Sequence, residues 1–259
     1  SPAQVSALTL DPTSSLMSLV LTTFTTISIN DHLLSPLDNW PIEPDISAEF
    51  PAAAIDINND GIDEFLVQEN NLHLNIYDKD VNLLHSLTCP GLGRCSQRFT
   101  TPAVGDFDKD GSPEIVAFND GSDKIYVFEH SGELKTGSPF DGMYGSSNES
   151  PIVGDVDGDG EYEIVANSNS TNGPYIHIYD FNGQVKYVIA PDKLLVQERQ
   201  QLSLGDIDND GIPEIIADSQ SYLAVYKFAE NRFNYATGWP QRKFLRNSFD
   251  FDNQIALVG

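Results

Sequence analysis

Hydrophobic residues occur along this chain in short runs, and no stretch shows the 3.6-residue periodicity of an amphipathic helix. Apolar segments such as Pro102-Ala-Val-Gly105 and Pro151-Ile-Val-Gly154 each precede an acidic segment. A second apolar segment follows it, as in Glu114-Ile-Val-Ala117 and Glu163-Ile-Val-Ala166. Short apolar runs bounded by Gly, Asp and Asn are typical of β-strands. The pattern therefore predicts an all-β protein in which acidic loops join consecutive strands.

The same order of elements recurs after each acidic loop. A third apolar segment ends in an aromatic residue, and a turn then leads to a fourth, more polar segment; Gly132 and Gly183 lie in two of these turns. The aromatic residues are Tyr77, Phe128, Tyr179 and Tyr226. Four short strands in about 50 residues are typical of one propeller blade. We expect a β-propeller of four-stranded antiparallel blades, with the acidic loop between the first and second strands.

Each acidic loop offers oxygen atoms at its positions 1, 3, 5 and 9 and has glycine at position 6. The loops begin at residues 56, 106, 155 and 206, so they are spaced 50, 49 and 51 residues apart. Calcium takes six to eight oxygen ligands, and glycine permits the positive φ that curls a loop around an ion. The predicted metal ligands are Asp56, Asn58, Asp60, Glu64, Asp106, Asp108, Asp110, Glu114, Asp155, Asp157, Asp159, Glu163, Asp206, Asp208, Asp210 and Glu214.

Two other interpretations of these loops are weaker. An EF-hand needs a glutamate at position 12, where this chain has Val67, Ala117, Ala166 and Ala217. Acidic turns without an ion would bring carboxylates together, and two such charges about 4 Å apart repel by about 4 kcal/mol at an effective dielectric constant of ~20. We expect about four calcium ions, because magnesium and manganese suit a flexible all-oxygen loop less well.

The repeat predicts one propeller over residues 1–259, with blades at about 1–45, 46–97, 98–148, 149–199 and 200–248. In the first blade, residues 12–16 stand where the acidic loop would be. Residues 249–259 predict the start of a further blade, because Ala256-Leu-Val-Gly259 matches the segments that precede the loops. We therefore expect a piece of a longer protein. The alternative is a five-bladed ring in which the last strand completes the N-terminal blade.

The loops and the segments Pro102-Ala-Val-Gly-Asp106 and Pro151-Ile-Val-Gly-Asp155 resemble the FG-GAP/VCBS repeat family, the calcium-loop blade of integrin α-chain propellers. The resemblance covers about residues 46–259 and, more weakly, residues 1–45. It implies a calcium-binding β-propeller. It does not imply one function, because the family includes adhesion modules, lectin-like domains, domains appended to hydrolases and a few polysaccharide lyases. The departures are Asn58 in the first loop and the absence of a loop in the first blade.

The composition narrows the possible partners. The chain has 39 acidic and 14 basic residues, and its net charge is −25. About four calcium ions would leave a charge near −17. Such a surface argues against nucleic acid and anionic membranes as partners. The apolar run at residues 16–29 is interrupted by Ser and Thr and is too short to cross a bilayer. We expect an extracellular or cell-surface protein, where calcium is abundant.

Two cysteines lie close together in a turn-rich segment, Cys89-Pro-Gly-Leu-Gly-Arg-Cys95. We predict a local disulfide, which loop-closure entropy values at roughly 2–2.5 kcal/mol; the alternative is a pair of free thiols in a reducing cell. The sequence also contains the glycosylation sequons Asn148-Glu-Ser and Asn169-Ser-Thr. These have meaning only in a eukaryotic protein, so their use stays open.

The chain shows no catalytic motif. G-x-S-x-G and H-E-x-x-H are absent, and the five histidines are scattered. The sequence therefore favours a non-catalytic module that binds a protein or a glycan, with residues 89–101, 139–150 and 189–201 as candidate contact segments. Two alternatives remain: part of a polysaccharide-degrading enzyme, either a lyase or a hydrolase-associated propeller, and a structural repeat of a larger extracellular assembly. A lyase needs basic residues, for which Arg242-Lys243-Phe-Leu-Arg246 is the local candidate.

Overall fold

The structure is a computed structural model, and it describes most of the chain. The described residues are 4–8, 18–22, 27–30, 53–69, 73–88, 99–119, 124–142, 150–170, 173–190, 201–218, 222–236 and 241–242. All regular structure within these ranges is β-strand or turn, so the prediction of an all-β fold is confirmed.

The strands form five antiparallel sheets, and each sheet uses strands that are consecutive in the chain. The first sheet contains β1 (Gln4–Leu8), β2 (Ser18–Thr22) and β3 (Ile27–Asn30). The second contains β4 (Ala53–Ile55), β5 (Glu64–Glu69), β6 (His73–Tyr77) and β7 (Leu83–Leu87). The third contains β8 (Ala103–Gly105), β9 (Glu114–Asn119), β10 (Lys124–Phe128) and β11 (Phe140–Asp141).

The last two sheets follow the same plan. The fourth contains β12 (Ile152–Gly154), β13 (Glu163–Ser170), β14 (Gly173–Tyr179) and β15 (Val185–Ile189). The fifth contains β16 (Gln201–Gly205), β17 (Glu214–Asp218), β18 (Tyr222–Ala229) and β19 (Arg232–Tyr235), and β20 (Gln241–Arg242) pairs with β18. The four-stranded antiparallel unit predicted from the repeat is confirmed in sheets two to four, and the fifth adds one strand to it.

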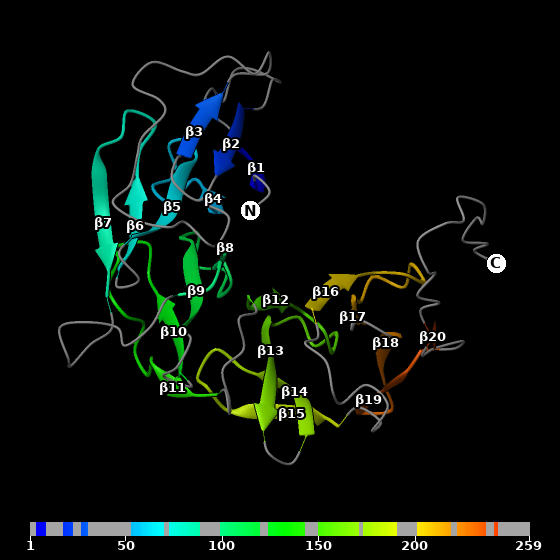
Figure 1. Cartoon of the computed structure of the whole chain (residues 1–259). Helices are drawn as coiled ribbons and strands as arrows, with labels where there is room; N and C mark the ends of the chain where they lie inside the picture. Colours follow the sequence, from blue (N-terminus) through cyan, green and yellow to red (C-terminus); the bar gives the residue numbers. More distant parts are fainter. Residues whose placement is uncertain are drawn as a thin grey trace, which may run out of the picture.

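The five sheets follow one another around an arc, with the first strands β4, β8, β12 and β16 on its inner side (Figure 1). Strand β1 contacts β4, β4 contacts β8, and β12 contacts β16. This radial arrangement of four-stranded sheets is that of β-propeller blades.

Strand register fixes the position of each acidic loop. Gly105 pairs with Glu114, Gly154 with Glu163, and Gly205 with Glu214, while Ile55 pairs with Glu64 in the second sheet. In every case the ninth loop residue is the first residue of the second strand. The loop therefore starts and ends at one closed strand pair, which holds its glutamate near its first aspartate.

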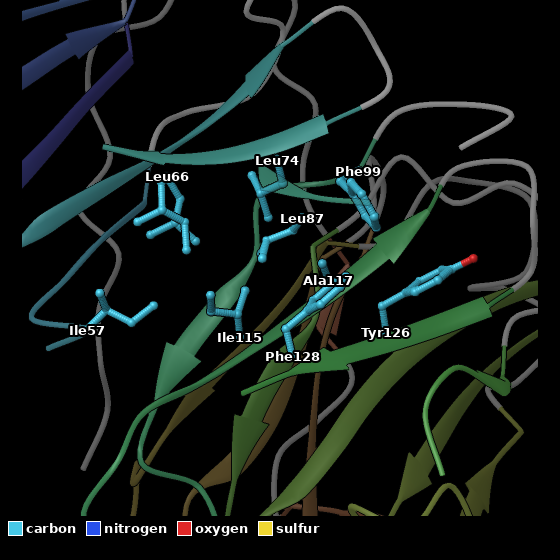
Figure 2. Close-up of a cluster of buried hydrophobic side chains, with 10 residues drawn as sticks. Ile57, Leu66, Leu74, Leu87, Phe99, Ile115, Ala117, Tyr126 and Phe128 are labelled. Atoms are coloured by element: carbon cyan, nitrogen blue, oxygen red, sulfur yellow. The ribbon is translucent and has the colours of Figure 1, made fainter. Parts of the chain in front are cut away.

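The hydrophobic core lies between neighbouring sheets rather than within one of them. Figure 2 shows one such layer, in which Leu66 and Leu74 from the second sheet face Ile115 and Phe128 from the third. Successive side chains of a strand point to opposite faces, so Val116 in β9 packs toward the fourth sheet instead. Both faces of a middle sheet are thus apolar, as face-to-face packing of sheets requires.

Several predictions concern residues outside the described ranges. These are the disulfide between Cys89 and Cys95, the sequon at Asn148, the degenerate loop at residues 12–16 and the further blade at residues 249–259. They stay predictions. A search of the described residues finds no helix with the length and apolar character needed to cross a membrane.

Candidate metal centre

The closing glutamate of every acidic loop is buried and held by the backbone of its own loop. Each glutamate is at most 2% exposed. Its carboxylate accepts a hydrogen bond from the N–H of the second loop residue, which reaches across the loop. The four bonds run from Ile57 to Glu64 (3.0 Å), Phe107 to Glu114 (2.8 Å), Val156 to Glu163 (3.0 Å) and Ile207 to Glu214 (2.8 Å).

The first aspartate of every loop is held by the glycine at position 6. The glycine N–H donates to its Oδ2, from Gly61 to Asp56 (2.7 Å), Gly111 to Asp106 (3.1 Å), Gly160 to Asp155 (3.0 Å) and Gly211 to Asp206 (2.9 Å). All four glycines have φ between 86° and 94°. Side chains are strained in this left-handed region, so glycine is required for the loop to curl back on its first residue.

The remaining side chains also turn toward the loop backbone. Asp60 Oδ1 accepts from the N–H of Ile62 (2.8 Å), and the fifth residues of the other three loops make the same bond. In the first loop, Asn58 Oδ1 accepts from the N–H of Asp60 (2.9 Å). The Asn58 amide donates to Glu64 (3.2 Å), so its side chain faces the carboxylate that closes the loop.

Three of the loops bring acidic oxygens into one cluster. In each cluster, one oxygen from each residue lies within 4.8 Å of the others: Asp106, Asp108 and Asp110; Asp155, Asp157 and Glu163; Asp206, Asp208 and Asp210. Glu114, Asp159 and Glu214 lie outside these groups of three. The first loop has the same type of backbone hydrogen bonds but carboxylates at only three of its four predicted ligand positions, and no such group is found for it among the described residues.

The clusters fit a hard cation by their donor chemistry and by two unsatisfied atoms. Glu114 is fully buried, and its Oε1 has no hydrogen-bond partner. Oδ1 of Asp155 is also buried without a partner. Buried carboxylate oxygens are costly when they lack a donor or a counter-charge. A cation bound by the loop would supply that charge.

Burial also changes the protonation of the glutamates. It raises the pKa of Glu64 and of Glu163 from the ordinary 4.5 to about 7. It raises the pKa of Glu114 as well, although the N–H of Phe107 opposes the shift. These carboxylates are therefore poor anions in their surroundings without a cation. Metal binding requires the deprotonated form and would displace the proton.

Three lysines contact carboxylates of the acidic loops, and the sequence pattern did not predict them. The Lys186 ammonium lies 2.8 Å from Asp157, 2.7 Å from Asp159 and 2.8 Å from Glu163. Lys135 lies 2.7 Å from Asp108. In the fourth loop, Lys227 contacts Asp208 and Asp210 and lies 3.6 Å from Glu214.

The electrostatic effect is largest at Lys186. Its burial acts to lower the pKa, but its hydrogen bonds with Asp157, Asp159 and Glu163 outweigh that effect and raise the pKa above the ordinary value. Lys186 is the second residue of a fourth strand, and its neighbour Val185 pairs with the aromatic residue Tyr179. Strand register therefore places this lysine, one residue after the partner of the aromatic residue, and no local sequence pattern predicts it.

The second loop follows the same rule and the first does not. Leu134 bridges Phe128, and Lys135 comes next. In the first loop Leu83 pairs with Tyr77, and the next residue is Leu84. The four loops therefore share their backbone hydrogen bonds but differ in the positive charge that faces their carboxylates.

A comparison with protein families accounts for the repeating loops. Residues 106–166 and 155–217 each match the FG-GAP-like repeat. Residues 106–217 of this chain therefore match FG-GAP-like repeats. Each matched repeat runs from the acidic loop of one sheet into the second strand of the next. The predicted family resemblance is confirmed over this part of the chain.

Several solved structures resemble this chain in fold. BBS1N in complex with ARL6DN aligns with a TM-score of 0.59 and 11% identity, covering 91% of this chain and 70% of that one. Rhamnogalacturonan lyase YesW aligns with a TM-score of 0.60 and 15% identity, covering 89% and 50%. The exotype rhamnogalacturonan lyase YesX gives 0.58 and 15%, covering 90% and 49%. The chain thus spans about half of each lyase. No curated protein sequence matches it.

Proposed function

We propose that this chain is a calcium-binding β-propeller module that acts outside the cell or at its surface, binds a protein or glycan partner and catalyses no reaction itself. The observation that carries the proposal is the clustering of carboxylate oxygens within 4.8 Å in three loops. The unsatisfied, fully buried Oε1 of Glu114 supports it. The FG-GAP-like repeats agree with it, since the matched residues include three of the loops.

The ligands of each ion would be the side chains at loop positions 1, 3, 5 and 9. Asp106, Asp108, Asp110 and Glu114 are the set in the second loop. Calcium prefers such oxygen donors and tolerates irregular geometry. A bound ion supplies two positive charges to the loop, and this chain's residues orient around it through the backbone hydrogen bonds already present. In the first loop, Asn58 would offer its amide oxygen.

Calcium binding is tested on the full chain after treatment with a chelator. Addition of calcium should raise the melting temperature, because a ligand specific for the native state adds about 2.7 kcal/mol at a hundredfold excess over its Kd. Elemental analysis should find bound calcium in the untreated protein. Asp108→Ala should reduce the calcium effect. Asp141→Ala is the matched control, since Asp141 is exposed and pairs with Lys124 (2.7 Å) away from the loops. An identical melt with calcium and with chelator, and no metal in the protein, would reject the proposal.

A partner of protein or glycan type is supported by the solved structures of similar fold. One of these is a complex of BBS1N with ARL6DN, and two are rhamnogalacturonan lyases. The acidic loops would be occupied by metal, so the connections between sheets are the better contact surface. Binding to a glycan array and to candidate surface proteins, measured with calcium present, tests this. Exchanging the segments 89–101, 139–150 and 189–201 without loss of binding would contradict it.

The second candidate is a part of a polysaccharide-degrading enzyme. It is favoured by the two rhamnogalacturonan lyases of similar fold, of which this chain would correspond to about half. The test is incubation with rhamnogalacturonan while the absorbance of unsaturated uronic products is followed. Product formation would reject the non-catalytic proposal. Glycan binding without product would support the non-catalytic proposal. The absence of product, of glycan binding and of binding to surface proteins would favour a structural repeat of a larger assembly.

A further inference from the structure

The acidic loops contact one another through the side chain at their fourth position. Asn59 Nδ2 in the first loop donates to the carbonyl oxygen of Gly111 in the second (2.9 Å). The Lys109 ammonium in the second loop donates to the carbonyl oxygen of Gly160 in the third. Donor and acceptor therefore have the same loop positions at both boundaries, four and six, although one donor is an amide and the other an ammonium.

Both ends of the first link are next to proposed metal ligands. Asn59 lies between Asn58 and Asp60 in the sequence. Gly111 follows Asp110, and its N–H donates to Asp106 Oδ2 (3.1 Å). The carbonyl and the N–H of Gly111 thus tie the first loop to the first ligand of the second.

The second link repeats this arrangement. Lys109 lies between Asp108 and Asp110. Gly160 donates its N–H to Asp155 Oδ2 (3.0 Å), which is the first ligand of the third loop. The Lys109 ammonium also lies 5.0 Å from the centre of the Tyr162 ring, a distance that allows a cation–π contact. The ammonium of Lys109 is therefore directed at two residues of the third loop.

The link is missing at the next boundary. The fourth residue of the third loop is Gly158, which has no side chain to donate. Ile212 of the fourth loop occupies the space that a side chain at Gly158 would need. A Cβ on Gly158 would lie 2.5 Å from Cδ1 of Ile212. In the fourth loop, Asn209 has the same φ of 60° as Asn59. Asn209 is exposed and makes no side-chain hydrogen bond with the residues that the structure describes.

We propose that Asn59 and Lys109 are positioning residues that couple calcium binding in the first three loops, while the fourth loop binds calcium independently. This rests on the calcium binding proposed above. An ion in the first loop fixes the backbone on both sides of Asn59. The fixed Asn59 amide then holds the carbonyl of Gly111 and so restrains the residue whose N–H reaches Asp106. The second loop is consequently already ordered when it binds its ion, which is a favourable (negative) coupling free energy between the two sites.

Each loop carries its own reporter for the test. The amide N–H of Gly61, Gly111, Gly160 or Gly211 donates to the first aspartate of its loop, so its NMR resonance reports on the occupancy of that loop. Calcium is added stepwise to the chelator-treated full chain, labelled on glycine, and the four resonances are followed separately. In the unaltered protein the first three loops should fill together, and the fourth should fill on its own curve.

The variant that breaks the first link is Asn59→Gly. Glycine accepts the positive φ, and the third loop already has glycine at this position, so the loop backbone is preserved. The apparent calcium affinity reported by Gly111 should fall at least about fivefold, the lower end of typical site-to-site coupling. The affinity reported by Gly211 should not change. The matched control is Asn209→Gly, which removes the same side chain at the same position and should leave all four curves unchanged.

The Lys109 link is tested by a double-mutant cycle, because Lys109→Met by itself also changes the charge of the second loop. Asp155→Asn weakens the third loop. It should lower the affinity reported by Gly111 when Lys109 is present and leave it unchanged in the Lys109→Met background.

The outcomes separate this inference from the calcium proposal. If no glycine resonance responds to calcium, calcium binding itself is rejected. If all four loops bind calcium and Asn59→Gly leaves the Gly111 curve in place, calcium binding stands and the coupling is wrong. A melt of each variant in chelator shows whether its fold is intact. If Asn59→Gly does not fold, the Asp155 and Lys109 cycle decides alone, and equal effects of Asp155→Asn in both backgrounds reject the coupling.

Discussion

The lysines that face the acidic loops give neighbouring loops different electrostatics. Asp157 and Glu163 are almost fully buried, and both contact Lys186. Without that ammonium, two buried carboxylates would lack a counter-charge. The two charges of a calcium ion in the loop would also compensate these carboxylates. Lys186 therefore matters most to the calcium-free protein and opposes the ion that would replace it.

Lys186→Met should destabilise the protein in chelator by about 2 kcal/mol or more, because a buried charged group loses its partner. The loss should be smaller in calcium, since the ion then compensates the same carboxylates. The rise in melting temperature on adding calcium should thus be larger in the variant than in the unaltered protein. Lys124→Met is the matched control, because Lys124 pairs with the exposed Asp141 and such surface pairs contribute about 0–1 kcal/mol. Equal calcium effects in both variants would count against this view of Lys186.

A second residue-scale prediction concerns His177 in β14. Burial lowers the pKa of His177 below its ordinary 6.5, and its ring stacks on Tyr179 with centroids 5.9 Å apart. A histidine with a lowered pKa binds its proton more weakly in the folded than in the unfolded chain. Its contribution to stability is therefore present above pH 6.5 and is lost as the pH falls through the folded pKa.

The pH effect can be isolated with His177→Phe, which keeps a flat ring in the stack. Between pH 7 and pH 5, urea unfolding should show a steeper loss of stability for the unaltered protein than for the variant. The exposed His130→Phe serves as control and should leave the slope as it is. Parallel profiles for the unaltered protein and His177→Phe would show that folding does not change the pKa of His177.

At the scale of elements, the second residue of an acidic loop can join the loop to the core. Its N–H holds the closing glutamate in all four loops, while its side chain packs into a hydrophobic cluster in the first three. Val156 is 0% exposed and packs with residues of β16–β19, whereas Ile207 at the same position of the fourth loop is 52% exposed. The side chain at this loop position therefore contributes to the hydrophobic core in the third loop and is exposed in the fourth.

Val156→Ala should destabilise the protein by roughly 1–3 kcal/mol, the usual cost of removing buried methyl groups and leaving a small cavity. Ile207→Ala removes more carbon but should change stability by no more than about 0.5 kcal/mol, as exposed substitutions do. Both are measured by urea unfolding at a fixed calcium concentration. A loss at Ile207 equal to that at Val156 would mean that Ile207 is covered in solution.

The sequence predicted the inner part of each blade well, because the signals there are local. The strand pair that closes a loop, the left-handed glycine and, in sheets two to four, the aromatic end of the third strand all follow from residue type and spacing. In the fifth sheet the prediction was wrong, because β18 continues past Tyr226 to Ala229. The outer strands were less predictable. In the third sheet, the segment after Gly132 forms only a bridge between Leu134 and Phe128, and β11 pairs with the other end of β10, opposite Lys124 and Ile125. The position at which a polar outer strand pairs depends on tertiary contacts, and its own sequence has no hydrophobic pattern that would predict it.

The lysines and the loop-to-loop bonds escaped the sequence analysis for a similar reason. Lys135 lies 27 residues after Asp108, and Asn59 lies 52 residues before Gly111. No local pattern connects residues so far apart. Only the bridge between Phe128 and Leu134 brings Lys135 to the loop, and only the packing of one sheet on the next brings Asn59 to Gly111. The candidate ligands could therefore be predicted from spacing, and the groups that tune them could not.

At the scale of the whole molecule, the net charge of −25 is concentrated in part on the acidic loops. Three lysines offset some of it locally, but the sum remains strongly negative. Like charges destabilise the compact state by mutual repulsion. Salt screens such repulsion, with a Debye length near 10 Å at 0.1 M and 3 Å at 1 M. The salt dependence of stability consequently measures how much of the charge the protein has left uncompensated.

In chelator, the melting temperature should rise by several degrees between low salt and about 0.5 M sodium chloride, since each kcal/mol is worth roughly 2–4 °C in a protein of this size. In saturating calcium the rise should be clearly smaller, because about four ions would already remove eight negative charges. Tetramethylammonium chloride distinguishes screening from weak sodium binding in the loops: this bulky cation screens charge but is a poor ligand for an oxygen cage. An equal effect of both salts identifies repulsion as the cause. A salt response that calcium leaves unchanged would place the destabilising charge outside the loops.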